Sequence, residues 1–148
     1  MIMKQSYPTF IYDTRDGSEH SFLVYVPDMD IFTEGDDFTD AIEMARDAIG
    51  VAGISMEDNN EKLPMPSTEA KAIEMAKKNS DIVDFSQGIL TYVDVDFFYY
   101  RRQIDMTTVR RNVSLPNWLN CAAEKAGVNV SNVLQEALIS TLKLERRM

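Results

Sequence analysis

Cysteine and histidine are almost missing from this chain, which has Cys121 and His20 and no others. A single cysteine cannot form an internal disulfide bond, and no Cys/His spacing matches a zinc site. The chain also has no Walker loop, no glycine-rich dinucleotide turn and no G-x-S-x-G nucleophile elbow. We therefore expect no metal, cofactor or catalytic residue. His20 is expected at the surface and Cys121 buried as a small apolar side chain.

Long apolar stretches are absent as well. No run reaches the roughly 18 apolar residues that a membrane-spanning helix needs. The start MIMKQSYPTF lacks the basic region and apolar segment of a secretory signal. Together with the single cysteine, this predicts a cytoplasmic protein without membrane contact. Apolar residues still make up 45% of the chain, enough for a core.

Basic residues are scarce in the first two thirds of the chain. Residues 1–100 hold 7 Lys and Arg against 20 Asp and Glu, a net charge of −13, whereas residues 101–148 hold 8 against 4, a net charge of +4. An acidic part joined to a basic part suggests two surfaces with opposite partners. A solvated acidic face that only aids solubility explains the charge equally well.

Three short strands are predicted near the N-terminus. Residues 7–13 and the run SFLVYV at 21–26 are rich in aromatic and β-branched residues, and the turn signal DTRDG separates them. Pro27 stops the second strand, and IFTEG at 31–35 makes a third.

A helix follows, because apolar residues recur at helical spacing after Asp36 or Asp37, either of which can cap it. Its apolar face comprises Phe38, Ala41, Ile42, Ala45, Ala48, Ile49 and Ala52. This face would cover the sheet. Residues 57–67 form a loop, and Ser67 can cap a short helix that runs to about Lys78.

Alternation returns in GILTYVDVDFF, which predicts a fourth strand. One side of it carries Ile89, Thr91, Val93, Val95 and Phe97, and the other Asp94 and Asp96. We expect FFYY at 97–100 to end this buried strand and pack at an interface, with base stacking as the alternative. Residues 98–108 would be a connector. Residues 1–97 thus predict an α+β fold, a small antiparallel sheet in the order β-β-β-α-(α)-β with helices over one face.

Residues 109–148 predict a second domain with a short strand and two helices. Pro116 suits the first turn of a helix, Gly127 suits its end, and Asn129 can cap the next helix. The apolar stripes are Trp118, Leu119, Ala122, Ala123 and Ala126 on the first helix, and Val130, Val133, Leu134, Ala137, Leu138, Thr141 and Leu142 on the second.

This second domain is expected to be a homodimer, or part of a higher oligomer such as a tetramer. Residues 109–142 are fewer than the roughly 40 below which a module rarely builds its own core. A lone strand also needs a ladder partner, so we expect two copies to pair their strands around a two-fold axis. The predicted dimer core is Val113, Leu115, Trp118, Leu119, Val133, Leu134 and Leu138.

The outward face of the predicted strand carries Arg110, Asn112 and Ser114. A two-stranded ribbon fits the DNA major groove, where Arg pairs with guanine, Asn with adenine and Ser with either. The backbone N–H groups after the Asn129 cap can hold a phosphate.

The stretch RRNVSLPNWLNCAAEKAGVNVSNVLQEAL at 110–138 resembles the ribbon-helix-helix family of transcriptional repressors. It has the alternating strand, a proline near the first helix, a glycine between the helices and a capped second helix. The resemblance implies that Arg110, Asn112 and Ser114 read bases. It also implies that the group Asn129, Val130 and Ser131 holds phosphate. A dimerisation or packing module without DNA contact is the alternative.

The stretch YPTFIYDTRDGSEHSFLVYVPDMDIFTEGDDFTDAIEMARDAI at 7–49 resembles the HicB family of bacterial antitoxins. The matching features are an early Tyr-Pro, a D-G turn, a strand ending in P-D, an aromatic-Thr-x-Gly-Asp stretch and an alanine-periodic helix. LPMPS at 63–67 matches the family's L-P-x-P-S.

The HicB resemblance implies a domain likened to a degraded ribonuclease H fold. It also implies a partner, a HicA-type toxin that is a small basic mRNA-cleaving ribonuclease, and repression of the operon that encodes both proteins. An acidic domain suits a basic partner. We expect Asp28, Asp30 and Glu34 to contact the toxin.

Two alternatives to an antitoxin remain. One is a stand-alone ribbon-helix-helix regulator whose first domain senses a small ligand. The other is a metal-dependent nuclease that uses Asp13 with Asp94 or Asp96, which requires carboxylates that converge on paired ions. We instead interpret these aspartates as solvent-facing residues of the strands.

Overall fold

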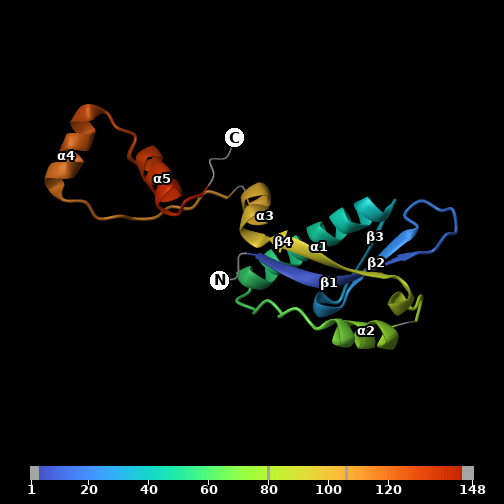
Figure 1. Ribbon diagram of the computed structural model, residues 1–148. Coiled ribbons are helices and arrows are strands. Elements are labelled where there is room, and N and C mark those ends of the chain that lie inside the picture. Colours follow the sequence, from blue (N-terminus) through green and yellow to red (C-terminus); the bar gives the residue numbers. More distant parts are fainter. Residues whose placement is uncertain (1–3, 80, 106, 145–148) are drawn as a thin grey trace. The chain divides into compact units, whose positions relative to one another are not determined.

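The computed structural model describes residues 4–79, 81–105 and 107–144 and divides the chain into two compact units, Met1–Thr107 and Thr108–Met148. Unit 1 contains a four-stranded sheet in the order β3-β2-β1-β4 (Figure 1). The strands are β1 (Lys4–Asp13), β2 (Phe22–Val26), β3 (Ile31–Gly35) and β4 (Ile89–Asp96), and every neighbouring pair is antiparallel. The predicted strands and the antiparallel sheet are therefore confirmed.

One face of the sheet is covered by α1 (Phe38–Asp58). Asp37 caps this helix, since its carboxylate accepts a hydrogen bond of 2.7 Å from the backbone N–H of Asp40. The core on this side joins alternate strand residues to the alanine stripe of the helix: Tyr7, Ile11, Val24, Val26, Val93 and Val95 from the sheet with Ala41, Ala45 and Ile49 from α1. The predicted helix face thus covers the sheet.

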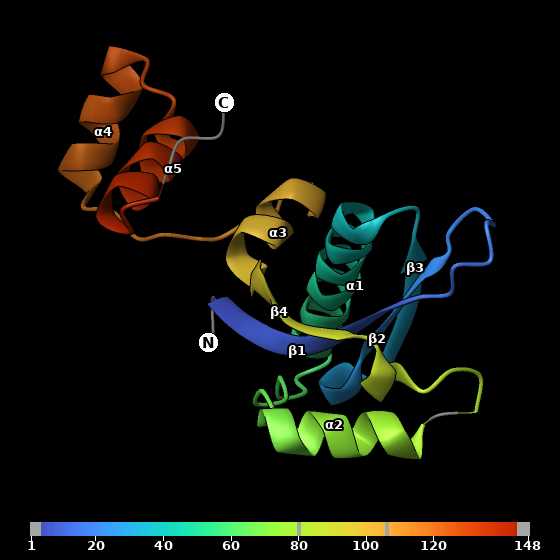
Figure 2. The same cartoon turned by 45° about the vertical axis from the view of Figure 1, so that its right-hand side comes forward.

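The opposite face of the sheet is covered as well, by α2 (Glu69–Lys78), as Figure 2 shows. A second core contains Phe10, Tyr25 and Phe85 together with Ala72 and Ala76 of α2. The expectation of helices over one face is wrong, because strand residues of both alternating sets are apolar and both faces need cover. The cap of α2 is Thr68, whose hydroxyl accepts from the N–H of Lys71, rather than Ser67.

A further helix, α3 (Phe97–Ile104), follows β4 directly. Asp96 caps it by accepting a 2.9 Å hydrogen bond from the N–H of Tyr99. A Cβ atom at Gly53 of α1 would lie 2.2 Å from Cε1 of Phe97, so the glycine is what lets α3 approach α1. Residues 98–104 are therefore helical and part of unit 1, whereas the sequence predicted a strand end and a connector there.

Unit 2 contains α4 (Asn117–Ala126) and α5 (Val130–Thr141). Gly127 ends α4 in a left-handed conformation with φ of 65°, and the Asn129 side chain caps α5 by accepting 3.2 Å from the N–H of Asn132. Both helices, the Gly127 turn and the Asn129 cap match the prediction. Residues 107–116 have no regular secondary structure. The strand expected from residue 109 is therefore not observed in this structure.

Candidate interaction surfaces

Three separate sequence motifs meet around Asp28, which lies in the short 3₁₀ helix η1 (Pro27–Met29). The Asp28 carboxylate accepts hydrogen bonds from the hydroxyl of Ser67 and, at 3.0 Å, from its backbone N–H. The Tyr7 hydroxyl donates to the carbonyl oxygen of Pro64 at 2.8 Å. Burial, reinforced by the negative charge of Asp28, raises the pKa of Tyr7 to about 12. These bonds fasten the loop before α2 to β1 and η1.

The acidic residues within the run 28–37 have different structural roles. Asp37 caps α1, and Asp36 lies with its Oδ1 atom 2.5 Å from Nδ1 of the exposed His20. Within the described residues, Asp30 and Glu34 are the two acids of this run whose carboxylates make no hydrogen bond or ion pair. Of the three residues expected to contact a toxin, Asp28 thus also anchors a loop, a role that local sequence did not indicate.

Glu34 lies at an open hollow of about 540 Å³ on the α2 side of unit 1. The hollow is bounded by β2, the edge strand β3 and residues 79, 81, 82 and 85. Its apolar lining comprises Leu23, Phe32, Ile82 and Phe85, and Glu34, Asn79 and Asp81 supply polar groups.

Aromatic rings form one wall of this hollow. The ring of Phe32 stacks on that of Tyr25, with centroids 4.7 Å apart, and its centroid lies 6.1 Å from that of Phe85. Phe32 nevertheless remains 56% exposed and Ile82 89% exposed. Large apolar side chains left open beside exposed carboxylates are typical of an interaction surface.

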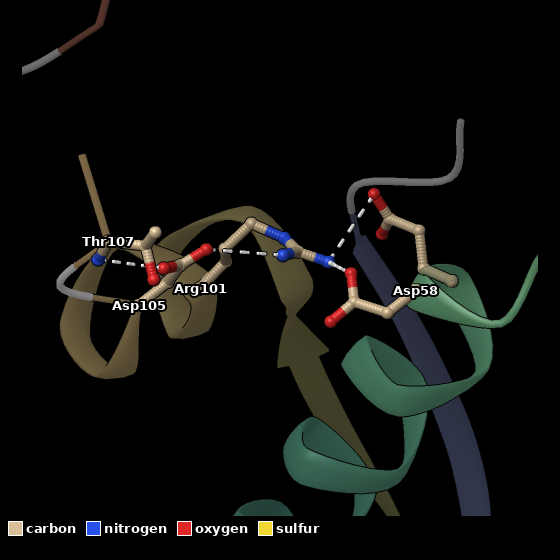
Figure 3. Close-up of polar contacts among 5 residues, drawn as sticks. Asp58, Arg101, Asp105 and Thr107 are labelled. Atoms are coloured by element: carbon tan, nitrogen blue, oxygen red, sulfur yellow. Dashed lines mark hydrogen bonds and ion pairs between the residues drawn. The ribbon is translucent and has the colours of Figure 1, made fainter. Parts of the chain in front are cut away.

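The end of α3 is held by a cluster of charges (Figure 3). Nη2 of Arg101 lies 2.8 Å from Oδ1 of Asp58 and 3.6 Å from Oε1 of Glu57, both at the end of α1. Nη1 lies 3.4 Å from Oδ2 of Asp105, whose Oδ1 atom accepts from the Thr107 N–H. The bond to Asp58 raises the pKa of Arg101, and the Thr107 N–H lowers that of Asp105. The cluster joins α3 to α1.

The apolar stripes of α4 and α5 face solvent in the single chain. Among the described residues of unit 2 none is buried, and Ala123, Leu134, Ile139 and Leu144 are only half-buried. Trp118 is 72% exposed and Val133 57%. The predicted core residues Val113, Leu115, Leu119 and Leu138 are exposed too. Cys121 is likewise exposed, contrary to expectation.

The residues predicted to bind DNA fall at two places in unit 2. Arg110, Asn112 and Ser114 lie exposed in the irregular segment before α4. The group Asn129, Val130 and Ser131 forms the start of α5, where free backbone N–H groups point out of the helix.

The geometry disfavours the nuclease alternative. Asp94 lies opposite Ser6 in the register of β1, whereas Asp13 lies opposite Phe22 at the other end of that strand. Seven residues of β1 separate these positions, so Asp13 and Asp94 lie about 23 Å apart along the strand, far more than paired metal ions allow. Arg46 contacts Asp94 at 3.1 Å and lowers the pKa of that carboxyl. Across the described residues, no three His, Cys, Asp or Glu side chains are grouped to hold a metal.

The solved structures similar to this chain include the following two. One, described as a toxin-antitoxin complex from Streptococcus pneumoniae, has 25% sequence identity and a TM-score of 0.57, with 94% of this chain and 99% of that chain covered. The other, the antitoxin HicB of Burkholderia pseudomallei, has 20% identity and a TM-score of 0.47, with 94% and 97% covered. No curated protein matches.

In the described part of the chain, no helix is long and apolar enough to cross a membrane.

The family described as HicB_like antitoxin of bacterial toxin-antitoxin systems matches residues 7–137. The match includes the motifs around Asp28, covers α4 and ends within α5. The chain therefore belongs to the HicB-like antitoxin family and is an antitoxin of a toxin-antitoxin system.

Proposed function

We propose that this protein binds and neutralises a HicA-type mRNA-cleaving toxin through unit 1 and represses its own operon through unit 2. In this proposal two copies pair the segments at 109–115 as an antiparallel ribbon, and α4 and α5 of both copies pack around it. The ribbon binds operator DNA in the major groove. The protein has no catalytic role.

One observation carries the second half of the proposal. The helices of unit 2 have well-formed ends, including the Gly127 turn and the Asn129 cap, yet no side chain of either helix is buried. A unit with ordered helices and an open apolar face needs a partner surface of the same kind. Two-fold pairing covers that face and completes the strand ladder at once.

Charge and family membership support the first half. Residues 1–100 carry a net charge of −13, which favours a basic protein partner and repels nucleic acid. The similar pneumococcal structure is described as a toxin-antitoxin complex.

In the second half of the proposal, base reading is assigned to Arg110, Asn112 and Ser114, which lie exposed before α4 in the basic part of the chain.

Co-purification tests the antitoxin role. The untagged chain is expressed with the tagged product of its neighbouring gene, a basic protein of small size, and purified through the tag. A stoichiometric complex is expected, together with relief of growth arrest. Growth arrest that persists, with no complex recovered, would contradict the proposal and favour the ligand-sensing regulator.

A further inference from the structure

The hollow beside β3 has no assigned role, and its chemistry is specific. Its exposed aromatic ring, Phe32, is held in place by stacking on Tyr25, so the ring is oriented before any partner arrives. Ile82 adds an apolar surface, and Glu34 and Asp81 add two exposed carboxylates. Asn79 is fixed by a 3.1 Å hydrogen bond from its side-chain nitrogen to the Tyr25 hydroxyl.

This combination suits one kind of side chain. An apolar group in the hollow would remove the carboxylates from water without giving them a partner. A phosphate or an acidic group would be repelled by Glu34 and Asp81. A guanidinium group stacks on an aromatic face, forms bidentate bonds with carboxylates and has an aliphatic stem that apolar side chains can cover. Lysine lacks the planar group that stacking requires.

We propose that the hollow receives an arginine side chain of the toxin, stacked against Phe32, with its stem against Ile82 and its guanidinium bound by Glu34. This inference rests on the proposed antitoxin function and names the contact through which unit 1 recognises its partner. The rest of the acidic surface attracts the toxin at long range, whereas the hollow provides the short-range contact.

Matched variants separate these two effects. Glu34→Gln and Glu43→Gln each remove one negative charge from unit 1, but Glu43 lies on the outer face of α1, away from the hollow. Ile82→Ser and Met65→Ser each remove one exposed apolar side chain, and Met65 does not line the hollow. All four positions are exposed, so each full-length variant is expected to fold.

Affinity is measured by calorimetry with toxin that has been stripped from the co-purified complex in denaturant and refolded. Glu34→Gln and Ile82→Ser should each weaken binding at least about fivefold, as expected of an interface anchor. Glu43→Gln and Met65→Ser should stay within about twofold of the wild type. A double-mutant cycle between Glu34→Gln and each Arg→Gln variant of the toxin should show coupling for one arginine.

Four outcomes would count against this inference. Equal losses in the Glu34 and Glu43 variants would assign the effect to overall charge. Unchanged affinity in both hollow variants, or the lack of a coupled arginine, would place the contact elsewhere. In each of these three cases the antitoxin role stands. If the wild-type chain itself fails to bind the toxin, the proposed function fails and this inference fails with it.

Discussion

Asp28 and Ser67 are 39 residues apart in the sequence, yet the Asp28 carboxylate accepts hydrogen bonds from both the backbone N–H and the hydroxyl of Ser67. A second bond, from Tyr7 to Pro64, runs beside it and joins residues 57 apart. The P-D pair of η1, the Tyr-Pro of β1 and the L-P-x-P-S loop are thus held together by these bonds. These bonds hold the loop that leads into α2, the helix over the second face of the sheet.

Replacing Ser67 with Ala should destabilise unit 1, because it leaves a half-buried carboxylate with one donor fewer. A hydrogen bond to a charged group is worth about 1.5–3 kcal/mol, so the free energy of unfolding in urea should fall by roughly that amount. Asp30→Asn is the matched control, since Asp30 is exposed and its carboxylate makes no bond within the described residues. Equal stability of the two variants would contradict the anchoring role.

Alkaline pH should weaken the fold through Tyr7. The pKa of its hydroxyl is about 12 in the folded chain, against about 10 in an unfolded one. Folding therefore favours the protonated form, and this stability is complete below pH 10 and lost as pH rises towards 12. Urea midpoints at pH 8 and pH 11 should differ less in Tyr7→Phe than in the wild type. Tyr92→Phe, at a half-exposed position on β4, should behave as the wild type does.

Alanine at Gly53 should be destabilising, although alanine normally favours a helix. Its Cβ would lie 2.2 Å from the buried ring of Phe97, so α3 would have to shift away from α1. Overpacking of this kind costs about 1–3 kcal/mol, more than the gain of roughly 1 kcal/mol in helix propensity. Thermal unfolding measures the balance, with Ser55→Ala on the exposed side of α1 as control. A raised melting temperature in Gly53→Ala would show that α3 does not pack as described.

Leu138→Asp or Val133→Asp should convert a dimer into a monomer. Each places a charge on the exposed apolar face of α5 that pairing would bury, and an unpaired buried charge is strongly unfavourable. Light scattering after gel filtration should give the mass of two chains for the wild type and of one chain for these variants. Val51→Asp, at an exposed site on α1, should remain dimeric. A wild type that is monomeric at high concentration would exclude the proposed ribbon.

The double change Arg110→Ala, Asn112→Ala should abolish specific operator binding and leave the dimer intact. Both side chains lie outside the predicted core, so oligomer mass should not change. Wild-type affinity should also fall steeply with salt, because phosphate contacts release counterions. Gel-shift titrations at several salt concentrations test both points, with Lys77→Ala in unit 1 as a control for the loss of one cation. Retained specific binding in the double variant would assign base reading to other residues.

Much of unit 1 could be predicted because its signals are local. The alternation of β1 and β2, the Pro27 stop and the Asp37 cap each act within a few residues. The helix α3 was missed because the alternation of β4 continues through Phe97, although Asp96 is a capping residue that could have indicated a helix. The second face was missed because Phe10 and Tyr25 need α2, which is distant in sequence.

The candidate sites could be predicted from the sequence to different degrees. The cap at Asn129 and the turn at Gly127 were predicted because each involves neighbouring residues. The hollow could not be predicted, since its lining comes from two strands and the segment after α2, and their alignment depends on strand register. The ribbon proposed for 109–115 is not seen in the single chain, where these residues have no regular secondary structure.

Under the proposed pairing, the unburied helices of unit 2 also have a consequence for the lifetime of this protein in the cell. A unit that is folded only when paired follows mass action, so its intact fraction falls as the number of copies falls. Unpaired helices open readily and are cut by proteases. Under the proposed pairing, scarcity of the antitoxin would thus accelerate its own degradation, and the supply of newly made chains would decide how long the toxin stays silent.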